Sequence, residues 1–400
     1  MSPHAAVQSV PAGPASVISE VGRKCLRLHL IEGVGPIRFA RLLKHFGGVD
    51  GVLGASASAL ERVNGIGRET AERIARGRDA PDADTEVALA ADRSVRIVCV
   101  LDAEYPPALR TISDPPPCVY VRGTLDPSDA LALAIVGARH CTRYGAEQAE
   151  RFGALAARAG LTVVSGLARG IDSAGHSGAL AVDGRTLAVQ GCGLCHVYPP
   201  ESAELAGRIA AQGALLSELP MKVVPEDRNF PRRNRIIAGL SLGVLVVEAA
   251  RNSGALITAR LAGDYNREVF ALPGRLDSPH AEGCNAMIQR GEAKLVATLD
   301  DILSELGDAG RALNPAGSAH VSAAAPSAAP GAGSTAREAL VATLDVPLRG
   351  LLDAFDDEPM SIEQLVEASG QTPARVAAGL TTLQLRGLVR RAGGDHFERC

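Results

Sequence analysis

The chain has 400 residues, a hydrophobic content of 46% and a formal net charge of −4 at pH 7. Domains usually contain about 100 to 200 residues, so this length predicts two or three domains, and the near-neutral charge excludes a chain that is basic throughout. Eight cysteines are scattered through apolar segments, and no apolar stretch approaches the roughly 18 residues that a membrane span requires. We therefore expect reduced thiols, no disulfide scaffold and no membrane contact.

Residues 1–17 contain many Ala, Pro, Ser and Val residues but lack the cationic start and continuous apolar core of a signal peptide. We expect this segment to be disordered and the protein to be cytoplasmic.

Residues 18–95 show apolar spacings typical of short helices joined by short loops. A glycine hairpin occurs twice in them, as Gly-Val-Gly at 33–35 and as Gly-Ile-Gly at 65–67. This tandem resembles a helix-hairpin-helix or SAM-like domain, in which such a turn leaves N–H groups at a helix N-terminus free to contact a phosphate. For the first copy a simple tight turn is an equal alternative, because Pro36 removes one donor.

Residues 96–306 alternate between short apolar strands and helical patterns. The strands are expected at 133–137, 161–165, 186–190, 214–217, 244–248 and 269–272. Helical periodicity follows the first and third of them, at 145–159 and 202–212. Repeated alternation predicts an extended Rossmann-like, doubly wound sheet of α/β class that is mostly parallel and covered on both faces. Ligands of such folds bind at the carboxyl ends of the strands.

Residues 307–334 are rich in Ala, Pro, Gly and Ser, so we expect a flexible linker. Residues 335–400 then predict three helices, at 347–355, 361–368 and 372–385, followed by a short hairpin. Ser361 and Gln364 have the spacing of a capping box. This order is that of a winged helix. It holds seven arginines and ten acidic residues, so a protein-contact module is favoured over one that reads a DNA groove.

The densest positive charge lies at 228–235, where four of eight residues are arginine and none is acidic. Arginine forks suit phosphate oxygens, and the ring of Phe230 could stack on an unpaired base. A solvated surface turn is the alternative. Three further segments, at 135–139, 164–172 and 251–259, place arginines or small-residue turns just after strand ends. If the strands are parallel, all four segments meet at one edge of the sheet, and 164–172 has the form of a phosphate cradle.

Nucleotide motifs are missing, since no Gly-Lys dipeptide occurs and the run Gly-Ala-Arg at 137–139 does not continue as a dinucleotide fingerprint. The segments instead resemble one bacterial family of natural transformation, DNA-processing protein A (DprA, also called Smf). The match spans about residues 95 to 300, and its most specific run is Arg-Asn-Arg-Ile-Ile-Ala-Gly-Leu-Ser at 233–241. The resemblance implies a core that forms a homodimer, binds single-stranded DNA in a basic pocket and loads RecA recombinase onto it.

The resemblance also implies DNA contacts, which fall on Arg139, Gly166, Arg169, Phe230, Arg233, Asn234, Arg235, Ser253 and Gly254. The family often has a lysine shortly before the phenylalanine, where this chain has Asp227 and Arg228, and we assign that role to Arg228. Gly170 and Arg232 lie in the same segments and complete the candidate set. No catalytic residue, metal ligand or cofactor is predicted.

Three features favour other readings. Residues 192–196 read Cys-Gly-Leu-Cys-His, the pattern of haem attachment, but haem attachment requires export, so we expect neither haem nor zinc. His176 shares a short predicted helix with Asp172 and Ser173, where adjacent residues do not face each other, so we expect a helix-surface or capping role. Glu248 could be a catalytic carboxylate, but it has no second polar partner at fixed spacing.

The sequence therefore predicts a non-enzymatic, cytoplasmic mediator that protects incoming single-stranded DNA and loads RecA during natural transformation. The resemblance alone implies the partners RecA and single-strand-binding protein. Two alternatives remain: a Rossmann-like nucleotide hydrolase, and a regulator that binds duplex DNA through the winged helix.

Overall fold

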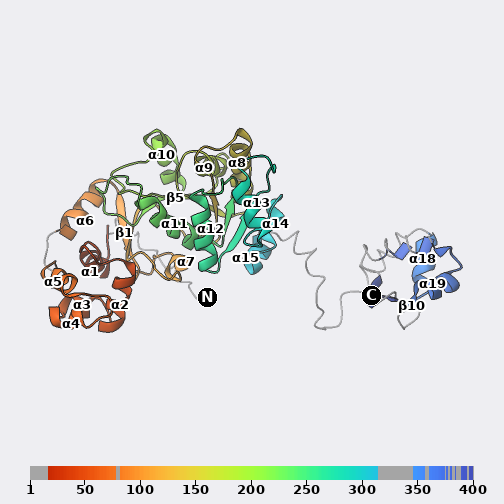
Figure 1. Ribbon diagram of the computed structural model, residues 1–400, viewed down its shortest axis with the longest axis horizontal. Coiled ribbons are helices and arrows are strands. Elements are labelled where there is room, and N and C mark those ends of the chain that lie inside the picture. The colour runs from red at the N-terminus through yellow and green to blue at the C-terminus, as the bar shows by residue number, and fades with distance from the viewer. Residues whose placement is uncertain are drawn as a thin grey trace, which may run out of the picture. The chain divides into compact units, whose positions relative to one another are not determined.

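The computed structural model describes residues 17–77, 82–313, 346–355 and 360–373, and beyond these 375–376, 379–380, 383, 389–393 and 396–399. The chain divides into two compact units, Met1–Ser322 and Ala323–Cys400 (Figure 1). Each unit is described by itself. The predicted disorder of residues 1–16 and most of the predicted linker, from residue 314 onwards, lie outside the described residues.

The first unit begins with short helices. In the described part these are α1 (Glu20–His29), α2 (Pro36–Phe46), α3 (Val49–Gly54), α4 (Ala57–Glu61), α5 (Arg68–Gly77) and α6 (Asp82–Asp92). The two glycine hairpins directly precede α2 and α5, as predicted. Gly33 and Gly65 have φ angles of 90° and 86°, in the left-handed region that favours glycine, so both turns depend on these residues. Gly47 ends α2 in the same left-handed conformation.

A nine-stranded sheet follows, with the order β1-β2-β6-β5-β4-β3-β7-β8-β9. Its strands are β1 (Val95–Cys99), β2 (Cys118–Gly123), β3 (Ala132–Val136), β4 (Thr162–Ser165), β5 (Thr186–Val189), β6 (Ala214–Ser217), β7 (Gly243–Val246), β8 (Glu268–Ala271) and β9 (Lys294–Leu295). All neighbours from β6 to β9 pair in parallel, whereas β2 pairs antiparallel with β1 and β6. The mostly parallel, doubly wound sheet is thus confirmed.

Helices cover both faces of this sheet because alternate side chains of each strand point to opposite sides. Leu133 and Ile135 of β3 pack on one face with residues of α8 (Arg143–Arg158), α9 (Ile171–Leu180) and α14 (Leu299–Leu303). Ala134 and Val136 pack on the other face with α7 (Pro107–Arg110), α11 (Asn229–Leu240), α12 (Ala255–Asp264) and α13 (Glu282–Gln289) (Figure 1). Helix α10 (Ala203–Gln212) lies beside β5 and β6.

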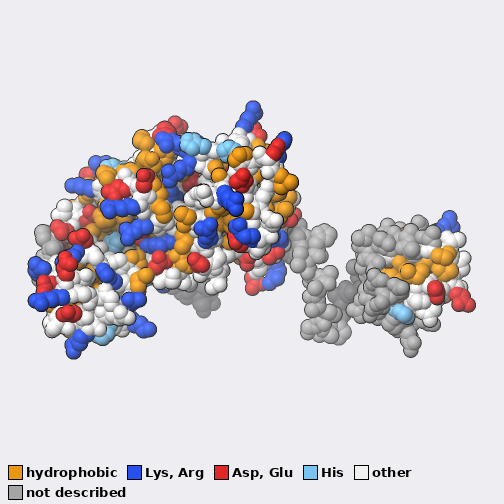
Figure 2. Space-filling model, viewed as in Figure 1, with side chains coloured by type: hydrophobic (Ala, Val, Ile, Leu, Met, Phe, Trp, Pro, Cys, Tyr) orange, Lys and Arg blue, Asp and Glu red, His pale blue; other side chains and the backbone are white. Residues whose placement is uncertain are grey.

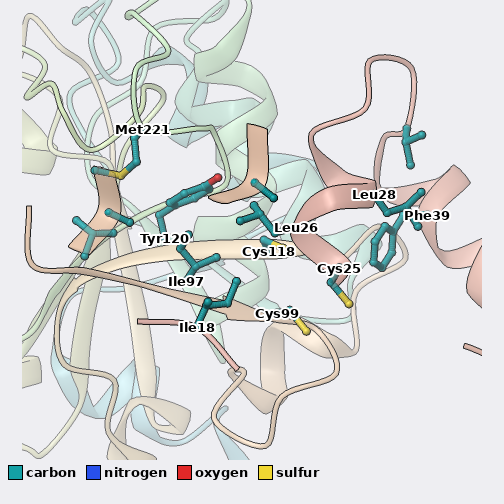
Figure 3. Packing of buried hydrophobic residues seen from close by; sticks show 14 of the residues in the cluster. Ile18, Cys25, Leu26, Leu28, Phe39, Ile97, Cys99, Cys118, Tyr120 and Met221 are labelled. Atoms are coloured by element: carbon teal, nitrogen blue, oxygen red, sulfur yellow. The ribbon is translucent and has the colours of Figure 1, made fainter. Parts of the chain in front are cut away.

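The N-terminal helices share a hydrophobic core with the antiparallel end of the sheet. Cys25 and Leu26 of α1 pack in one buried cluster with Ile97 of β1, Tyr120 of β2 and Met221, which follows β6 (Figure 3). Polar contacts reinforce this packing, since Glu86 accepts a hydrogen bond of 2.5 Å from the backbone N–H of Met221. This shared core holds the first glycine hairpin beside the loops of the sheet.

The second unit has the predicted winged-helix elements. Helix α18 (Val346–Asp353) and helix α19 (Ile362–Ser369) pack around Leu351, Leu365 and Phe397. The Ser361 and Gln364 capping box is present. Strands β10 (Met360–Ser361), β11 (Val389–Gly393) and β12 (His396–Arg399) form a sheet of order β10-β12-β11, to which β10 is an addition that the sequence did not predict. The described residues between 373 and 383 are helical, and the rest of the third predicted helix lies outside the described residues.

Several boundaries differ from the sequence expectations. Residues 95–123 contain β1 and β2, which are not among the expected strands, and the two-residue β9 is too short for a pattern. Gly307–Leu313 is helix α15 rather than the start of the linker, because Leu313 packs on the core of the sheet. Within the described residues, no helix is long and apolar enough to cross a membrane.

Candidate nucleic-acid interface

A cavity of about 350 Å³ opens at the carboxyl ends of the parallel strands. We call it the first cavity, and it is lined by Gly137, Arg139, Ala168, Asp172, Phe230, Arg233, Asn234, Ser253, Gly254 and Ile257, among others. It lies where β4 and β7 flank β3 on opposite sides, which is the switch point at which doubly wound sheets bind ligands. All four segments that the sequence singled out reach this cavity, as predicted from parallel strands.

A small recess of about 20 Å³ adjoins the first cavity and shares Arg139, Ala168, Phe230 and Arg233 with it. Its lining is completed by Gly166, Arg169, Gly191, Tyr198 and Pro199. Figure 2 shows Lys and Arg side chains gathered over the part of the unit where Figure 1 places β5 and α11, with hydrophobic side chains among them. The surface around the recess therefore combines cationic and apolar side chains.

Arg233 is the buried cation of this site. Its side chain is only 6% exposed, its Nη1 lies 4.0 Å from Asp172 Oδ2, and its buried Nε has no hydrogen-bond partner in the described part of the chain. Burial lowers the pKa of Arg233; Asp172 opposes this effect and the charge of Arg139 adds to it. A buried guanidinium with one distant carboxylate and a cationic neighbour lacks the partners that buried charges normally have. An anion in the cavity would supply them.

The glycine loop after β4 serves this arginine rather than a phosphate. A Cβ atom on Gly166 would lie 1.3 Å from Arg233 Nη1, so only glycine leaves room for the guanidinium. The backbone N–H groups of Gly166 and Ala168 donate to Asp172 Oδ2 at 3.1 and 3.4 Å. Two N–H groups of the predicted phosphate cradle at 164–172 are thus not free for a phosphate, because the carboxylate of Asp172 accepts from them.

Gly170 also has a packing role. Its φ is 74°, and a Cβ there would come within 2.4 Å of the carbonyl oxygen of Ala138, in the loop that carries Arg139. Gly170 lines neither the first cavity nor the recess. It allows the close approach of two loops and thereby positions Arg139.

Phe230 stands in a stack of side chains. The Cζ atom of Arg139 lies 5.0 Å from the centroid of its ring, and the ring of Tyr198 lies 5.2 Å away at 34°. A Cβ on Gly191 would approach the ring to 2.7 Å. A base that stacks on Phe230 must therefore exchange with Arg139 or Tyr198. Sequence reasoning missed Tyr198 as a site residue.

Helix α11 divides the arginine-rich segment between two sides. Arg233 and Asn234 face the first cavity, whereas Arg232 and Arg235 line a different cavity on the other side of the helix. Arg232 and Arg235 are three positions apart and lie on one side of the helix, which Arg233 does not share. The arginines of 228–235 therefore do not all face one pocket.

The remaining candidates lie at the edges of the site. Arg169 is half-exposed at the recess and pairs with Glu201 at 2.5 Å. Arg228 is 78% exposed, pairs with Glu226 and lines none of these cavities. The side-chain amide of Asn234 donates to the carbonyl oxygen of Gly254 at 3.4 Å, and Ser253 Oγ accepts from Ala255 N at 3.3 Å. These two bonds fix the start of α12 against α11.

The residues that favoured other readings have structural partners. Glu248 is buried and accepts from Thr142 N at 2.8 Å and Thr142 Oγ1 at 2.6 Å, at the start of α8. His176 is fully buried, not on the helix surface as expected, and its Nδ1 lies 2.7 Å from Thr186 Oγ1. Burial, with the charge of Arg233, lowers the pKa of His176 to about 3.

The haem-like segment shows no cluster of ligands. Cys192 is buried with its Sγ 3.5 Å from Gln190 Oε1, and Cys195 donates its backbone N–H to Met221 O. Among the described residues, no three His, Cys, Asp or Glu side chains are grouped as metal ligands would be. Burial raises the pKa of Cys192 to about 11, which is that of an unreactive core thiol.

Fold and cavity together define a Rossmann-like α/β protein whose switch point presents buried and exposed arginines around an aromatic stack. Comparisons with known proteins give the family. The sequence model described as DNA recombination-mediator protein A matches residues 96–307, the DprA winged helix domain matches 334–395, and the SAM-like helix-hairpin-helix tandem matches 26–77. The chain belongs to the DNA recombination-mediator protein A family.

Individual relatives agree with this assignment. Protein Smf of Synechocystis sp. is 36% identical over 385 residues, which cover 92% of this chain and 96% of that protein. DNA processing protein DprA of Bacillus subtilis is 40% identical over 216 residues, covering 54% of this chain and 72% of that protein. The X-ray structure of DNA processing protein A from Streptococcus pneumoniae has 34% sequence identity and a TM-score of 0.61, and the match covers 70% of this chain and 95% of that chain.

Proposed function

We propose that this chain binds single-stranded DNA at the first cavity and acts as a cytoplasmic recombination mediator that does not cut the strand. Arg233 is the observation that carries the proposal, because it is a buried cation without a full set of partners. A phosphate has the charge and the acceptor oxygens to complete its coordination. Arg139 and Arg169 stand nearby at the recess for neighbouring phosphates.

The aromatic stack supports an unpaired strand as the ligand. Phe230 and Tyr198 offer ring faces to a base, and such stacking contributes about 1 to 3 kcal/mol per base. In a duplex, each base face is already covered by its neighbours, so a ring in the recess gains nothing from duplex DNA. Binding without cleavage is favoured because Glu248 is engaged by Thr142 and Asp172 by backbone N–H groups.

The biological setting follows from the family. We propose that the chain forms a homodimer, protects incoming DNA during natural transformation and loads RecA onto it, with single-strand-binding protein as a further partner. Residues 18–95, 96–306 and 335–400 would act as the helix-hairpin-helix, DNA-binding and winged-helix domains. The winged helix, with more acidic residues than arginines, would contact protein rather than DNA.

The test uses the full chain and one oligonucleotide sequence in single-stranded and double-stranded form. A mobility shift should show that the protein prefers the single strand. Arg233→Ala should weaken binding of that single strand. A parallel assay should show no hydrolysis of nucleoside mono- or triphosphates. Equal binding of the duplex, or nucleotide turnover that depends on Glu248, would support one of the alternatives instead.

A further inference from the structure

A second cavity, of about 880 Å³, lies on the other side of α11. One wall is the first glycine hairpin with the start of α2, residues 31–38, and the other is formed by Arg232 and Arg235 of α11 and Leu261 of α12. The shared core described above holds the hairpin in this place. Of the DNA contacts that the family resemblance implies, Arg235 alone lines this second cavity.

The two cavities adjoin each other. Pro231 and Ile257 line both of them. Pro231 is exposed and Ile257 is 37% exposed, so they form an apolar ridge between the cavities that a ligand can contact. A strand that leaves the first cavity beside Phe230 therefore meets the ridge and then the second cavity.

The interior of the second cavity suits a nucleobase. Its walls are mainly apolar, with Leu30, Val34, Leu219 and Leu261 among them. Small-molecule sites typically combine such walls with a few convergent polar groups. A base has the matching chemistry, because its two faces are apolar and its edge carries donors and acceptors.

Two polar atoms of this cavity lack partners in the described part of the chain. They are Nη1 of Arg235 and Nδ1 of His29, and both are buried. The Nε2 atom of His29 lies 3.1 Å from the carbonyl oxygen of Glu218, which only accepts, so we assign the ring hydrogen to Nε2. Nδ1 is then an acceptor and Arg235 Nη1 is a donor. A base edge that presents one donor and one acceptor carries the two groups that these atoms lack.

Charge at the cavity mouth allows a phosphate backbone to approach. Asp114 and Glu218 are both paired with Arg235, and Glu32 is paired with Arg73. Arg232 is exposed and makes no ion pair within the described ranges. Arg232 and Arg38, which also lines this cavity and makes no ion pair within the described ranges, are thus available for a phosphate.

We propose that the second cavity binds a nucleobase of the same single strand whose phosphate is held by Arg233 in the first cavity. This subsite rests on the proposed function. With this subsite, the DNA-binding site extends over both sides of α11, from Phe230 on one side to the glycine hairpin on the other. The helical hairpin then contributes to single-strand binding through its cavity wall.

The test compares two lengths of oligodeoxythymidylate, about 5 and about 15 nucleotides, within the range of single-strand site sizes. Ile37→Asp and Arg232→Ala change only the second cavity. Ile37 is 54% exposed near the N-terminus of α2, where a carboxylate is tolerated, so folding should persist. Arg143→Ala, at a side chain 92% exposed on α8, is the matched control.

Each of the two variants should lower affinity for the longer strand by about five-fold or more and leave the shorter strand unchanged, because Arg232→Ala removes a phosphate contact and Ile37→Asp adds a charge that repels the strand. No loss, or equal loss for both lengths, would contradict the second subsite. Failure of the proposed function is separate: it would appear as short-strand binding that does not respond to Arg233→Ala.

Photo-cross-linking gives an independent readout. A longer oligonucleotide with 5-iododeoxyuridine at successive positions is bound to the full chain and irradiated, and the adducts are mapped by mass spectrometry. Adducts within residues 29–38 are expected for one position of the label. Adducts confined to residues of the first cavity would overturn the proposal.

Discussion

The two sides of α11 differ in how they treat a buried arginine. Arg233 and Arg235 have side chains that are 6% and 9% exposed and lie two residues apart. Arg235 is bonded to Glu218 and lies 3.5 Å from Asp114, so it has two carboxylates. Arg233 has only Asp172, at 4.0 Å, and Asp172 is itself held by backbone donors. The charge of Arg235 is balanced by carboxylates of the protein, whereas the charge of Arg233 is not.

This difference teaches that the density of arginines in a sequence does not reveal their roles. The role of each arginine depends on the charges that face its guanidinium group. A residue whose neighbours balance its charge stabilises the fold, whereas one whose neighbours leave it unbalanced favours an anionic ligand. The predictions below test this division of α11.

The largest expected effect is on stability at Arg235. Arg235→Ala should lower the free energy of unfolding by about 3 to 5 kcal/mol, because it leaves Asp114 and Glu218 without their cation. Arg233→Ala should cost clearly less, since Asp172 keeps its bonds from Gly166 and Ala168. Urea unfolding of both variants measures the difference. Equal losses would mean that the two arginines are both structural.

The next effect concerns the aromatic stack. Phe230→Ala should weaken single-strand binding by about 1 to 3 kcal/mol without changing its salt dependence, because stacking releases no counterions. Phe230→Tyr, which keeps the ring, should bind nearly as the parent. Titrations by fluorescence anisotropy at several salt concentrations check both. A change of slope in the alanine variant would show that Phe230 acts through the arginines instead.

The pH dependence of stability tests the burial of His176. Its pKa in the folded protein, about 3, lies below its ordinary value of 6.5, so the unfolded chain takes up the proton first. His176 therefore leaves the free energy of unfolding unchanged above about pH 6.5. Between about pH 6.5 and pH 3 it lowers the free energy of unfolding by about 1.4 kcal/mol for each pH unit that the pH falls.

His176→Gln should remove that loss, and urea unfolding between about pH 7 and pH 5 measures it. Burial raises the pKa of Asp172, but this group titrates in both proteins, so their difference isolates His176. The same slope in both would place His176 in contact with water.

The smallest effect is expected at Arg228. Its ion pair with Glu226 is exposed, and such pairs contribute about 0 to 1 kcal/mol. Arg228→Ala should therefore leave stability and single-strand affinity almost unchanged. A loss as large as that of Arg233→Ala would restore the role that the sequence assigned to Arg228.

Much of the fold was predictable from periodicity. The alternation of apolar strands and helices gave the parallel sheet, and parallel strands brought the four segments to one edge. The antiparallel strands β1 and β2 were missed because prolines at 106–107 and 115–117 indicate a connector. These prolines lie between the strands, where they do not interrupt the ladder.

The site was only partly predictable, because the phase of helix α11 determines which side chains face the first cavity. A solvated surface turn was the alternative for 228–235, but proline is tolerated in the first turn of a helix, and α11 begins at Asn229. Because the segment is helical, Arg232 and Arg235 lie on a different side of the helix from Arg233. His176 is buried by segments that are distant in the sequence, so no local pattern shows its burial. The same holds for the hydrogen bonds that Asp172 accepts from the loop after β4.

The most direct measurement of the central claim is the salt dependence of single-strand binding by Arg233→Ala, with Arg143→Ala as the control. If Arg233 neutralises a phosphate, the log–log slope of the binding constant against salt should decrease by about 0.7 in the Arg233 variant and stay unchanged in the control. Circular dichroism confirms that both variants fold. An Arg233 variant that keeps the parental slope would contradict the account, because the guanidinium would then face no phosphate.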